Sequence, residues 1–459
     1  MSTAPHLSPM RTELRESLRL AAPLVLANLL QMAVYAIDVI FVARLGAEAL
    51  AAASLSTSLF GLLVWASSGL TGSAISLIAA ELGRGRHALR EVRRTLRMAL
   101  WLSGLAGLAG MAICAFGESI MLATGQTATV AARAGAFLAL LLWSLIPQIG
   151  CNVLRGFVAA LGRPVVATLI TALAIVINAI GNYMFVFGNF GAPAMGLEGS
   201  ALSTLITSVI TLLAYAAAIQ ADRRMRRYHA FGRWWRAEWQ RFREIVRLGV
   251  PIALIVVAEG GFFGSAAFLM GLLGPEQLAG HAVALQVAAF AFQVPFGVGQ
   301  AATIRVGYRF GAGDRAGAGR AGWAGLVVCI LFAGCAALTM LLFPRAILSV
   351  YVDVSDPANV AMLGFALIYL RVGAAFQLFD GIQAVAAGAL RGLQDTRVPM
   401  QMALFGYWVI GFGAAVLLGF RTPLGGLGVW FGLALGLVVV AALLLWRWYR
   451  RERLGLFPR

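Results

Sequence analysis

The chain has 459 residues, of which 61% are hydrophobic and 12% are charged. Ordinary soluble domains carry about 25% charged residues, so this composition excludes a water-soluble globular protein. The formal charge of +17 does not indicate nucleic-acid binding, because the basic residues stand in short segments between apolar runs. The composition predicts an all-α polytopic membrane protein.

Residues 1–19 are polar and have no small-residue cleavage site, so we expect a cytoplasmic tail and not a removed signal peptide. Apolar runs follow, each long enough to cross the hydrocarbon core as a helix of about 20 residues. Breaks in hydrophobicity predict twelve transmembrane helices, at 20–43, 50–80, 98–116, 134–154, 165–188, 197–219, 248–272, 278–304, 321–343, 360–389, 398–420 and 425–446.

The distribution of arginine predicts the orientation of these helices. The chain contains no lysine, so all 36 basic residues are arginines. When both termini and the even-numbered loops are assigned to the cytoplasm, 31 arginines lie inside and four lie outside. This asymmetry follows the positive-inside rule. We therefore expect a multi-pass protein of the bacterial cell inner membrane with both termini in the cytoplasm.

An internal repeat divides the chain into two halves. Pro23 and Gly69 match Pro251 and Gly297 at the same shift of 228 residues. Each half has six spans, an even number, so both insert with the same orientation. The repeat predicts two pseudo-symmetric six-helix lobes, an N-lobe at 20–219 and a C-lobe at 248–446.

The segment between the lobes, 220–247, is expected to be a cytoplasmic linker, and 447–459 a cytoplasmic C-terminal tail. The linker contains Trp234, Trp235 and Trp239 among arginines. This composition suits an amphipathic helix on the anionic inner leaflet, and it equally suits a plain connection between lobes.

Only three acidic residues lie well inside predicted spans, namely Asp38, Glu259 and Asp380. A charge at the centre of a membrane helix costs at least about 2.5–3.5 kcal/mol, so each acid needs a local reason to be there. A buried carboxylate can bind a proton or a metal cation, and this competition can couple ion entry to substrate exit. The alternative is a structural acid that hydrogen-bonds a neighbouring helix.

Amide side chains share helix faces with two of these acids. Gln31 lies seven residues before Asp38, and Gln377 and Gln383 stand three residues on either side of Asp380. These residues are candidate supporting groups of two polar sites.

Three further polar residues lie inside predicted spans. Asn178 and Asn182 face the same side of the fifth helix at a spacing of four, where they can line a site or join helices by hydrogen bonds. His281 suits either a proton relay or a neutral, buried packing role.

The motifs resemble the multidrug and toxic compound extrusion (MATE) transporters, most closely the bacterial NorM-like branch, over almost the entire chain. In the first half, the resemblance depends on Asp38 followed by the segment 45–51. In the second half it depends on Pro251 and Glu259, on the segments 281–284 and 304–307, and on Phe376-Gln377-x-x-Asp380-x-x-Gln383 leading into 387–392.

The resemblance implies two six-helix lobes and alternating access driven by cation entry. It implies that Glu259 and Asp380 form a C-lobe cation site, with Na⁺ as a candidate ligand. It also implies that Asp38, Asn178, Asn182 and Thr204 form the N-lobe cation or substrate site. Phe376 departs from the pattern, because relatives can carry tyrosine there, so one hydroxyl ligand is missing.

We therefore predict a multidrug efflux antiporter that exports small, cationic, amphipathic compounds in exchange for Na⁺ or H⁺. It is expected to work as a monomer in the lipid bilayer, without a cofactor and without a nucleic-acid partner. The alternative transporter is a flippase for a lipid-linked oligosaccharide or another amphipathic lipid. An enzyme is not expected, since the sequence contains no DxD motif, paired histidines or nucleophile constellation, and hence no catalytic residues are assigned.

Overall fold

The structure, a computed structural model, describes residues 9–85, 87–232 and 234–457. Within these ranges, twelve helical spans have the length and apolar composition needed to cross a membrane, which confirms the predicted number. Eight of the first nine spans are single long helices: α1 (Pro9–Ala43), α2 (Ala47–Arg84), α3 (Ala88–Ala115), α7 (Pro164–Phe187), α8 (Leu197–Ala221), α10 (Trp239–Leu273), α11 (Pro275–Gly311) and α12 (Arg315–Leu342).

The other four spans are α17 and three that combine segments. They are α5, η1 and α6 (Ala128–Leu141, Leu142–Ser144, Leu145–Ala160), η3 and α14 (Pro357–Asn359, Val360–Gly392), α15, η4 and α16 (Arg397–Leu404, Phe405–Phe412, Gly413–Phe420), and α17 (Gly426–Tyr449). Short segments in the connections are α4 (Gly117–Ala123), η2 (Asn189–Gly191), α9 (Arg223–Arg226) and α13 (Pro344–Leu348).

Several helices continue beyond the apolar runs that predicted them. The first begins at Pro9, inside the predicted tail, and the seventh begins at Trp239, inside the predicted linker. A helix satisfies its own backbone hydrogen bonds, so it can continue through polar residues beyond the hydrocarbon core. In the linker, α9 covers only Arg223–Arg226 and turns follow it, so the segment is a connection and not one amphipathic helix.

By packing, the chain forms two compact units. Unit 1 comprises Met1–Val25 and Leu254–Arg459, and unit 2 comprises Leu26–Ala253. The divisions fall inside α1 and α10, so each unit contains the first part of a helix whose remainder belongs to the other unit.

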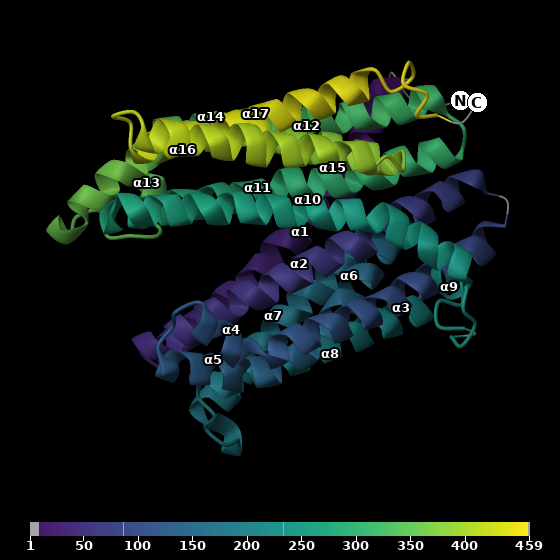
Figure 1. Ribbon diagram of the computed structural model, residues 1–459. Helices are drawn as coiled ribbons and strands as arrows, with labels where there is room; N and C mark the ends of the chain where they lie inside the picture. The colour runs from purple at the N-terminus through teal and green to yellow at the C-terminus, as the bar shows by residue number, and fades with distance from the viewer. Residues whose placement is uncertain (1–8, 86, 233, 458–459) are drawn as a thin grey trace, which may run out of the picture. The chain divides into compact units, whose positions relative to one another are not determined.

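Unit 2 is built around α6, which packs against α2, α3, α7 and α8, and α7 also packs along α8 (Figure 1). One of its apolar clusters fills the space between α2, α3, α6 and the start of α10, with Leu77, Leu96, Phe157 and Ile245 almost fully buried. These contacts hold α7 and α8 in place, the two helices that carry Asn178, Asn182 and Thr204.

Unit 1 is built around α14, which packs against α11, α12 and α17 (Figure 1). Small residues allow a close approach: a Cβ atom on Gly388 of α14 would collide with the Gly299 carbonyl group of α11. The Thr303 hydroxyl donates hydrogen bonds to both the Gly299 and the Gly388 carbonyl oxygens. Such small-residue contacts are typical of membrane helix pairs.

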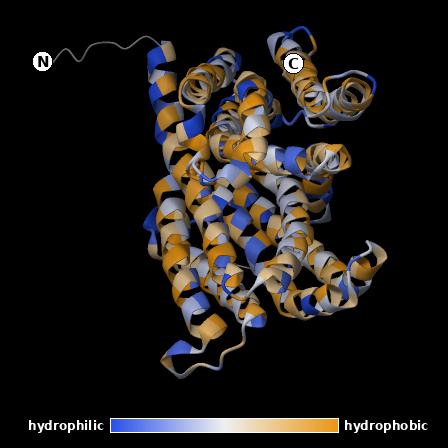
Figure 2. Ribbon diagram, turned by 90° about the vertical axis from the view of Figure 1, so that its left-hand side faces the viewer, coloured by the Kyte–Doolittle hydropathy of each residue, from blue (hydrophilic) through white to orange (hydrophobic). Residues whose placement is uncertain are grey.

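The outer surfaces of both units are apolar. Large side chains within the spans, such as Leu169, Phe268 and Leu331, are 65–70% exposed. Figure 2 shows hydrophobic residues along most of the helical surface and a hydrophilic run where the first helix begins. An apolar surface of this extent requires lipid as its solvent.

Candidate functional site

The first polar centre lies in unit 2 around Asp38 of α1. Its Oδ1 atom accepts hydrogen bonds from the Nδ2 atoms of Asn178 at 3.0 Å and Asn182 at 2.8 Å. Its Oδ2 atom accepts one from the Thr204 hydroxyl at 3.3 Å. We call these four residues the N-lobe centre. All three donors are neutral, so the hydrogen bonds orient the carboxylate without neutralising its charge.

The spacing of four residues on α7 allows both asparagines to reach one acid. The Asn182 amide also donates to the Asn178 backbone carbonyl at 3.0 Å, and the Ser203 hydroxyl donates to that same carbonyl at 3.0 Å. Asn178 and Asn182 are completely buried, and these additional bonds fix their positions. Within the described residues, no hydrogen bond connects Gln31 to this centre.

The second polar centre lies in unit 1. The Gln383 Nε2 atom donates to Glu259 Oε1 at 2.9 Å and to Asp380 Oδ1 at 3.1 Å, so one amide bridges the two acids. The Tyr407 hydroxyl donates to Gln383 Oε1 at 2.7 Å and thereby fixes the orientation of the amide. We call Glu259, Asp380, Gln383 and Tyr407 the C-lobe centre.

Tyr407 reaches Gln383 from η4, a π-helical segment between α15 and α16. A π-helix inserts extra backbone relative to an α-helix and changes which residues face the interior, and such segments are frequent at functional sites. The Tyr407 ring is completely buried and stacks on Phe262 at 5.3 Å between ring centroids. Phe262 is three residues after Glu259 on α10. The stacking therefore joins η4, which carries the hydroxyl, to α10, which carries the acid.

Three predicted residues lie apart from this hydrogen-bond network. The Phe376 ring stacks on Trp430 of α17 at 5.3 Å, and the His281 ring meets the edge of Trp430 at 5.6 Å. His281 and Gln377 are buried, and neither side chain has a hydrogen-bond partner among the described residues. The surroundings of His281, a tryptophan ring and no hydrogen-bond partner, resemble those of a buried packing residue more than those of a proton relay.

The two centres supply ligands of one chemical type. Carboxylate, amide and hydroxyl oxygens meet at each centre, and hard monovalent or divalent cations prefer such oxygens. Among the described residues, no cluster of three or more His, Cys, Asp or Glu side chains has a metal-binding arrangement.

Two members of these arrangements are absent from the sequence prediction. Ser203 supports Asn178, and Tyr407 supports Gln383. Serine and tyrosine are ordinary in transmembrane helices, so neither stands out in an apolar run as an acid does.

The substitution Tyr407→Phe tests whether the hydroxyl orients the bridging amide. We expect a loss of several-fold in apparent cation affinity, because one hydrogen bond contributes about 0.5–1.5 kcal/mol. The ring and its stacking on Phe262 are retained, so the amount of folded protein should stay the same. The measurement is the dependence of dye export on cation concentration. An unchanged dependence would show that Gln383 is held in place without Tyr407.

Twelve spans, a twofold repeat and a buried acidic centre in each half define a polytopic secondary transporter. The MatE family matches the chain at residues 23–184 and 251–417, which together cover most of both halves. The chain belongs to this family, the multidrug and toxic compound extrusion transporters.

Curated relatives match nearly from end to end. The chain is 45% identical to the "Probable multidrug resistance protein NorM" of Mesorhizobium japonicum, over 97% of this chain and 95% of the relative. It is 42% identical to the protein of the same name from Brucella suis, over 95% of this chain and 93% of the relative.

Solved structures share the fold at lower identity. A multidrug resistance MATE family transporter of the MOP superfamily in an outward-facing conformation matches with a TM-score of 0.87 and 21% identity, over 100% of both chains. A MOP superfamily transporter from Pyrococcus furiosus matches with a TM-score of 0.86 and 20% identity, over 99% of both chains. These matches support the twelve-helix architecture.

Proposed function

We propose that this protein is an antiporter that exports cationic, amphipathic compounds while Na⁺ or H⁺ enters, by alternating access. The observation that carries the proposal is the C-lobe centre, where a single amide donates to both Glu259 and Asp380. Relatives named multidrug resistance proteins support the drug-like class of substrate.

Two carboxylates that share one donor form a site with too much negative charge for a low-dielectric interior. A proton, a metal cation or a cationic substrate relieves this repulsion, and one bound charge lowers the site's affinity for the next. Occupation by the incoming ion therefore favours release of the outgoing cation, which is the requirement for exchange. Gln383 donates to both acids and Tyr407 donates to Gln383, so these neutral groups keep the acids in place.

The N-lobe centre contributes a single negative charge. Among the described residues, Asp38 accepts side-chain hydrogen bonds only from the neutral groups of Asn178, Asn182 and Thr204, so its charge is available to a cation. Asp38 and the C-lobe acids therefore provide two separate cation-binding centres, one per repeat. A ligand that binds the outward and inward states with different affinity shifts the equilibrium between them.

The proposal includes location and assembly. The arginine distribution supports the bacterial inner membrane with both termini in the cytoplasm. One chain carries both centres, so a monomer is sufficient for the exchange cycle.

Everted membrane vesicles test the function. We expect everted vesicles that contain the protein to accumulate a fluorescent cationic dye when Na⁺, or in a separate experiment H⁺, is more concentrated in the lumen than in the medium, so that the ion leaves as the dye enters. One of the two ion gradients should drive accumulation, and that result identifies the coupling ion. The control is a variant that lacks all three acids, Asp38→Asn, Glu259→Gln and Asp380→Asn. Dye accumulation that neither gradient stimulates, or that the control variant also supports, would contradict antiport.

A further inference from the structure

Ion pairs outside the two polar centres connect the two sequence repeats. In unit 1, the Glu13 carboxylate of α1 pairs with Arg305 of α11 at 2.6 Å and with Arg309 of α11 at 3.2 Å. Glu13 belongs to the first polar segment of the chain and the two arginines to the second half. The Glu13 side chain is only 3% exposed, so its charge depends on these partners. We call Glu13, Arg305 and Arg309 the Glu13 cluster.

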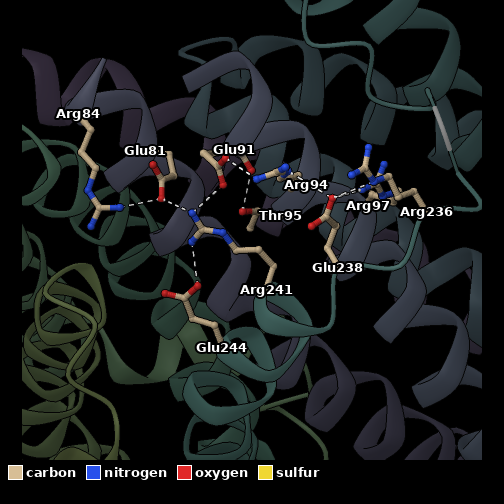
Figure 3. Close-up of polar contacts among 10 residues, drawn as sticks. All are labelled: Glu81, Arg84, Glu91, Arg94, Thr95, Arg97, Arg236, Glu238, Arg241 and Glu244. Carbon is tan, nitrogen blue, oxygen red and sulfur yellow. Dashed lines mark hydrogen bonds and ion pairs between the residues drawn. The ribbon is translucent and has the colours of Figure 1, made fainter. Parts of the chain in front are cut away.

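In unit 2, a matching cluster forms around Arg241 of α10 (Figure 3). Its guanidinium group pairs with Glu81 of α2 at 2.8 Å, with Glu91 of α3 at 2.9 Å and with Glu244 at 2.8 Å. The Glu81 side chain is 4% exposed. We call Arg241, Glu81, Glu91 and Glu244 the Arg241 cluster.

Glu238, next to this cluster in Figure 3, reinforces the same connection. It pairs with Arg94 and Arg97 of α3, each at 3.3 Å. The beginning of α10 is thus tied by charge to α2 and α3 at two points.

The two clusters occupy equivalent positions in the repeat with their charges exchanged. The shift of 228 residues that aligns the halves places Glu13 on Arg241 and Glu81 on Arg309. The first helix of one half carries the acid, and the first helix of the other half carries the base. The second helix of each half carries the same sign of charge as the first helix of that half, Glu81 in the first half and Arg309 in the second.

This exchange of charge selects the partner of each helix. If the beginning of α1 packed on the end of α2 in its own half, Glu13 would face Glu81, two like charges. If α10 packed on α11 in the same way, Arg241 would face Arg305 and Arg309. Like charges in close contact are unfavourable, so the arrangement combines attraction to the correct partner with repulsion from the wrong one.

Equivalent backbone contacts accompany the ion pairs. A Cβ atom on Gly69 of α2 would lie 3.1 Å from the Cα atom of Ala253 in α10. A Cβ atom on Gly297 of α11 would lie 3.0 Å from the Cα atom of Val25 in α1. Gly69 and Gly297 are related by the same shift, as are Val25 and Ala253. The same type of helix crossing therefore occurs twice, once in each unit.

We propose that the Glu13 and Arg241 clusters are crossed latches that hold the two repeats together at their arginine-rich ends. The inference rests on the proposed alternating-access function, in which this side closes and opens once per cycle. Opening requires both latches to separate.

The composition of the latches suits reversible contact. The three arginine side chains of the latches are 18–33% exposed, so water already reaches part of each charge. After separation the acids and bases can be hydrated, whereas an apolar contact of the same area would expose hydrocarbon to water. A polar latch can therefore exchange partners with water at low net cost.

Cross-linking tests the latch in the full-length protein, in a background where Cys114, Cys151, Cys329 and Cys335 are replaced by serine. Glu13→Cys and Arg305→Cys are introduced together and joined with a short bis-methanethiosulfonate reagent. We expect dye export to fall to the level of vesicles without the protein and to return when the link is reduced. Undiminished export by the linked protein would overturn the proposal, because the contact would then never open.

The matched control links two positions within one repeat. Asp395 and Arg447 form a 2.6 Å ion pair in which both residues belong to the second half, and each side chain is 12% exposed. Cysteines at these two positions, joined with the same reagent, are expected to leave export intact. Loss of export in this control as well would mean that cross-linking acts through general rigidity, which also overturns the proposal.

A readout independent of export separates the latch from the proposed function. Ser17 lies one turn after Glu13 on α1 and is 5% exposed, so a Ser17→Cys reporter reacts slowly with a maleimide while the latch is closed. Neutralising both latches with Glu13→Gln and Arg241→Gln is expected to increase the labelling rate. A Ser144→Cys reporter, in a completely buried position of unit 2, should remain unlabelled and so exclude unfolding.

The outcomes are distinct. Faster Ser17→Cys labelling in a protein that exports no dye would support the latches and contradict the proposed function. An unchanged labelling rate in a protein that does export dye would contradict the latches alone.

Discussion

The Asp380→Asn variant is expected to export a cationic dye about tenfold to a hundredfold more slowly than the parent protein, since interactions with a charged group contribute about 1.5–3 kcal/mol. Asparagine has nearly the shape of aspartate and can still accept a hydrogen bond from Gln383, so the helix packing should be retained. The charge is lost, and Glu259 becomes the only acid of the C-lobe centre. The site then no longer requires a second cation for neutrality, and exchange loses its coupling.

The measurement is the initial rate of dye export from cells or vesicles with equal amounts of folded protein. Asp353→Asn is the matched control, because the Asp353 carboxylate accepts hydrogen bonds from the nearby Ser355 in an exposed loop of the same half and lies in neither polar centre. The control should export at the parental rate. Equal rates for Asp380→Asn and Asp353→Asn would remove Asp380 from the coupling mechanism.

The sequence predicted the acids of both centres because a carboxylate in an apolar run is rare and conspicuous. The pairing of Asn178 and Asn182 was also predictable, because a spacing of four places both amides on one face of α7. Helical spacing does not predict that both amides bond Asp38. Asp38 lies 140 residues before Asn178, and only the packing of α1 on α7 brings the two together.

Helical spacing alone does not decide which of the predicted glutamines, Gln31, Gln377 or Gln383, can hydrogen-bond an acid. Residues three and six positions apart on an α-helix wind around it, so Gln377 and Gln383 point in directions about 120° apart. Gln383 therefore reaches the acids, and Gln377 does not. Gln31 shares the face of Asp38 but lies about 10 Å away along the helix axis, since each residue rises about 1.5 Å.

Tyr407 could not be predicted, since its direction depends on a π-helical segment that leaves no clear mark in hydrophobicity. For the latch residues, by contrast, the sequence does contain a signal. Glu13, Glu81, Arg241 and Arg309 are ordinary charged residues at helix ends, and the repeat already relates them by one shift. The alignment contains the exchange of charge, but only the structure gives it a meaning, because the repeat does not say which helices meet.

Close contact between α11 and α14 supports a second large effect, on stability. Adding one methyl group with Gly388→Ala is expected to lower the free energy of unfolding by about 1–3 kcal/mol, the usual cost of overpacking a tight contact. The new Cβ atom would collide with the backbone carbonyl group of Gly299, and its distance to the Gly299 Cα atom would be 3.0 Å. Backbone atoms cannot rotate away as a side chain can.

The helices must separate to accept this methyl group, and the Thr303 hydroxyl then loses at least one of its two carbonyl partners. Asp380 lies about two turns before Gly388 on the same helix, so the displacement also disturbs the C-lobe centre. Thermal unfolding of the purified protein measures the loss of stability, and dye export measures the effect on the site.

Gly364→Ala is the matched control on α14, because a Cβ atom there would meet no other atom within 4 Å. Alanine is a better helix former than glycine by about 0.5–1 kcal/mol, so this variant should be as stable as the parent or slightly more so. The two substitutions are chemically identical and differ only in whether a neighbouring helix occupies the space. If both variants unfold at the same temperature, the contact between Gly388 and Gly299 is not the constraint that positions α14, and the geometry of the acidic centre must depend on other contacts of that helix.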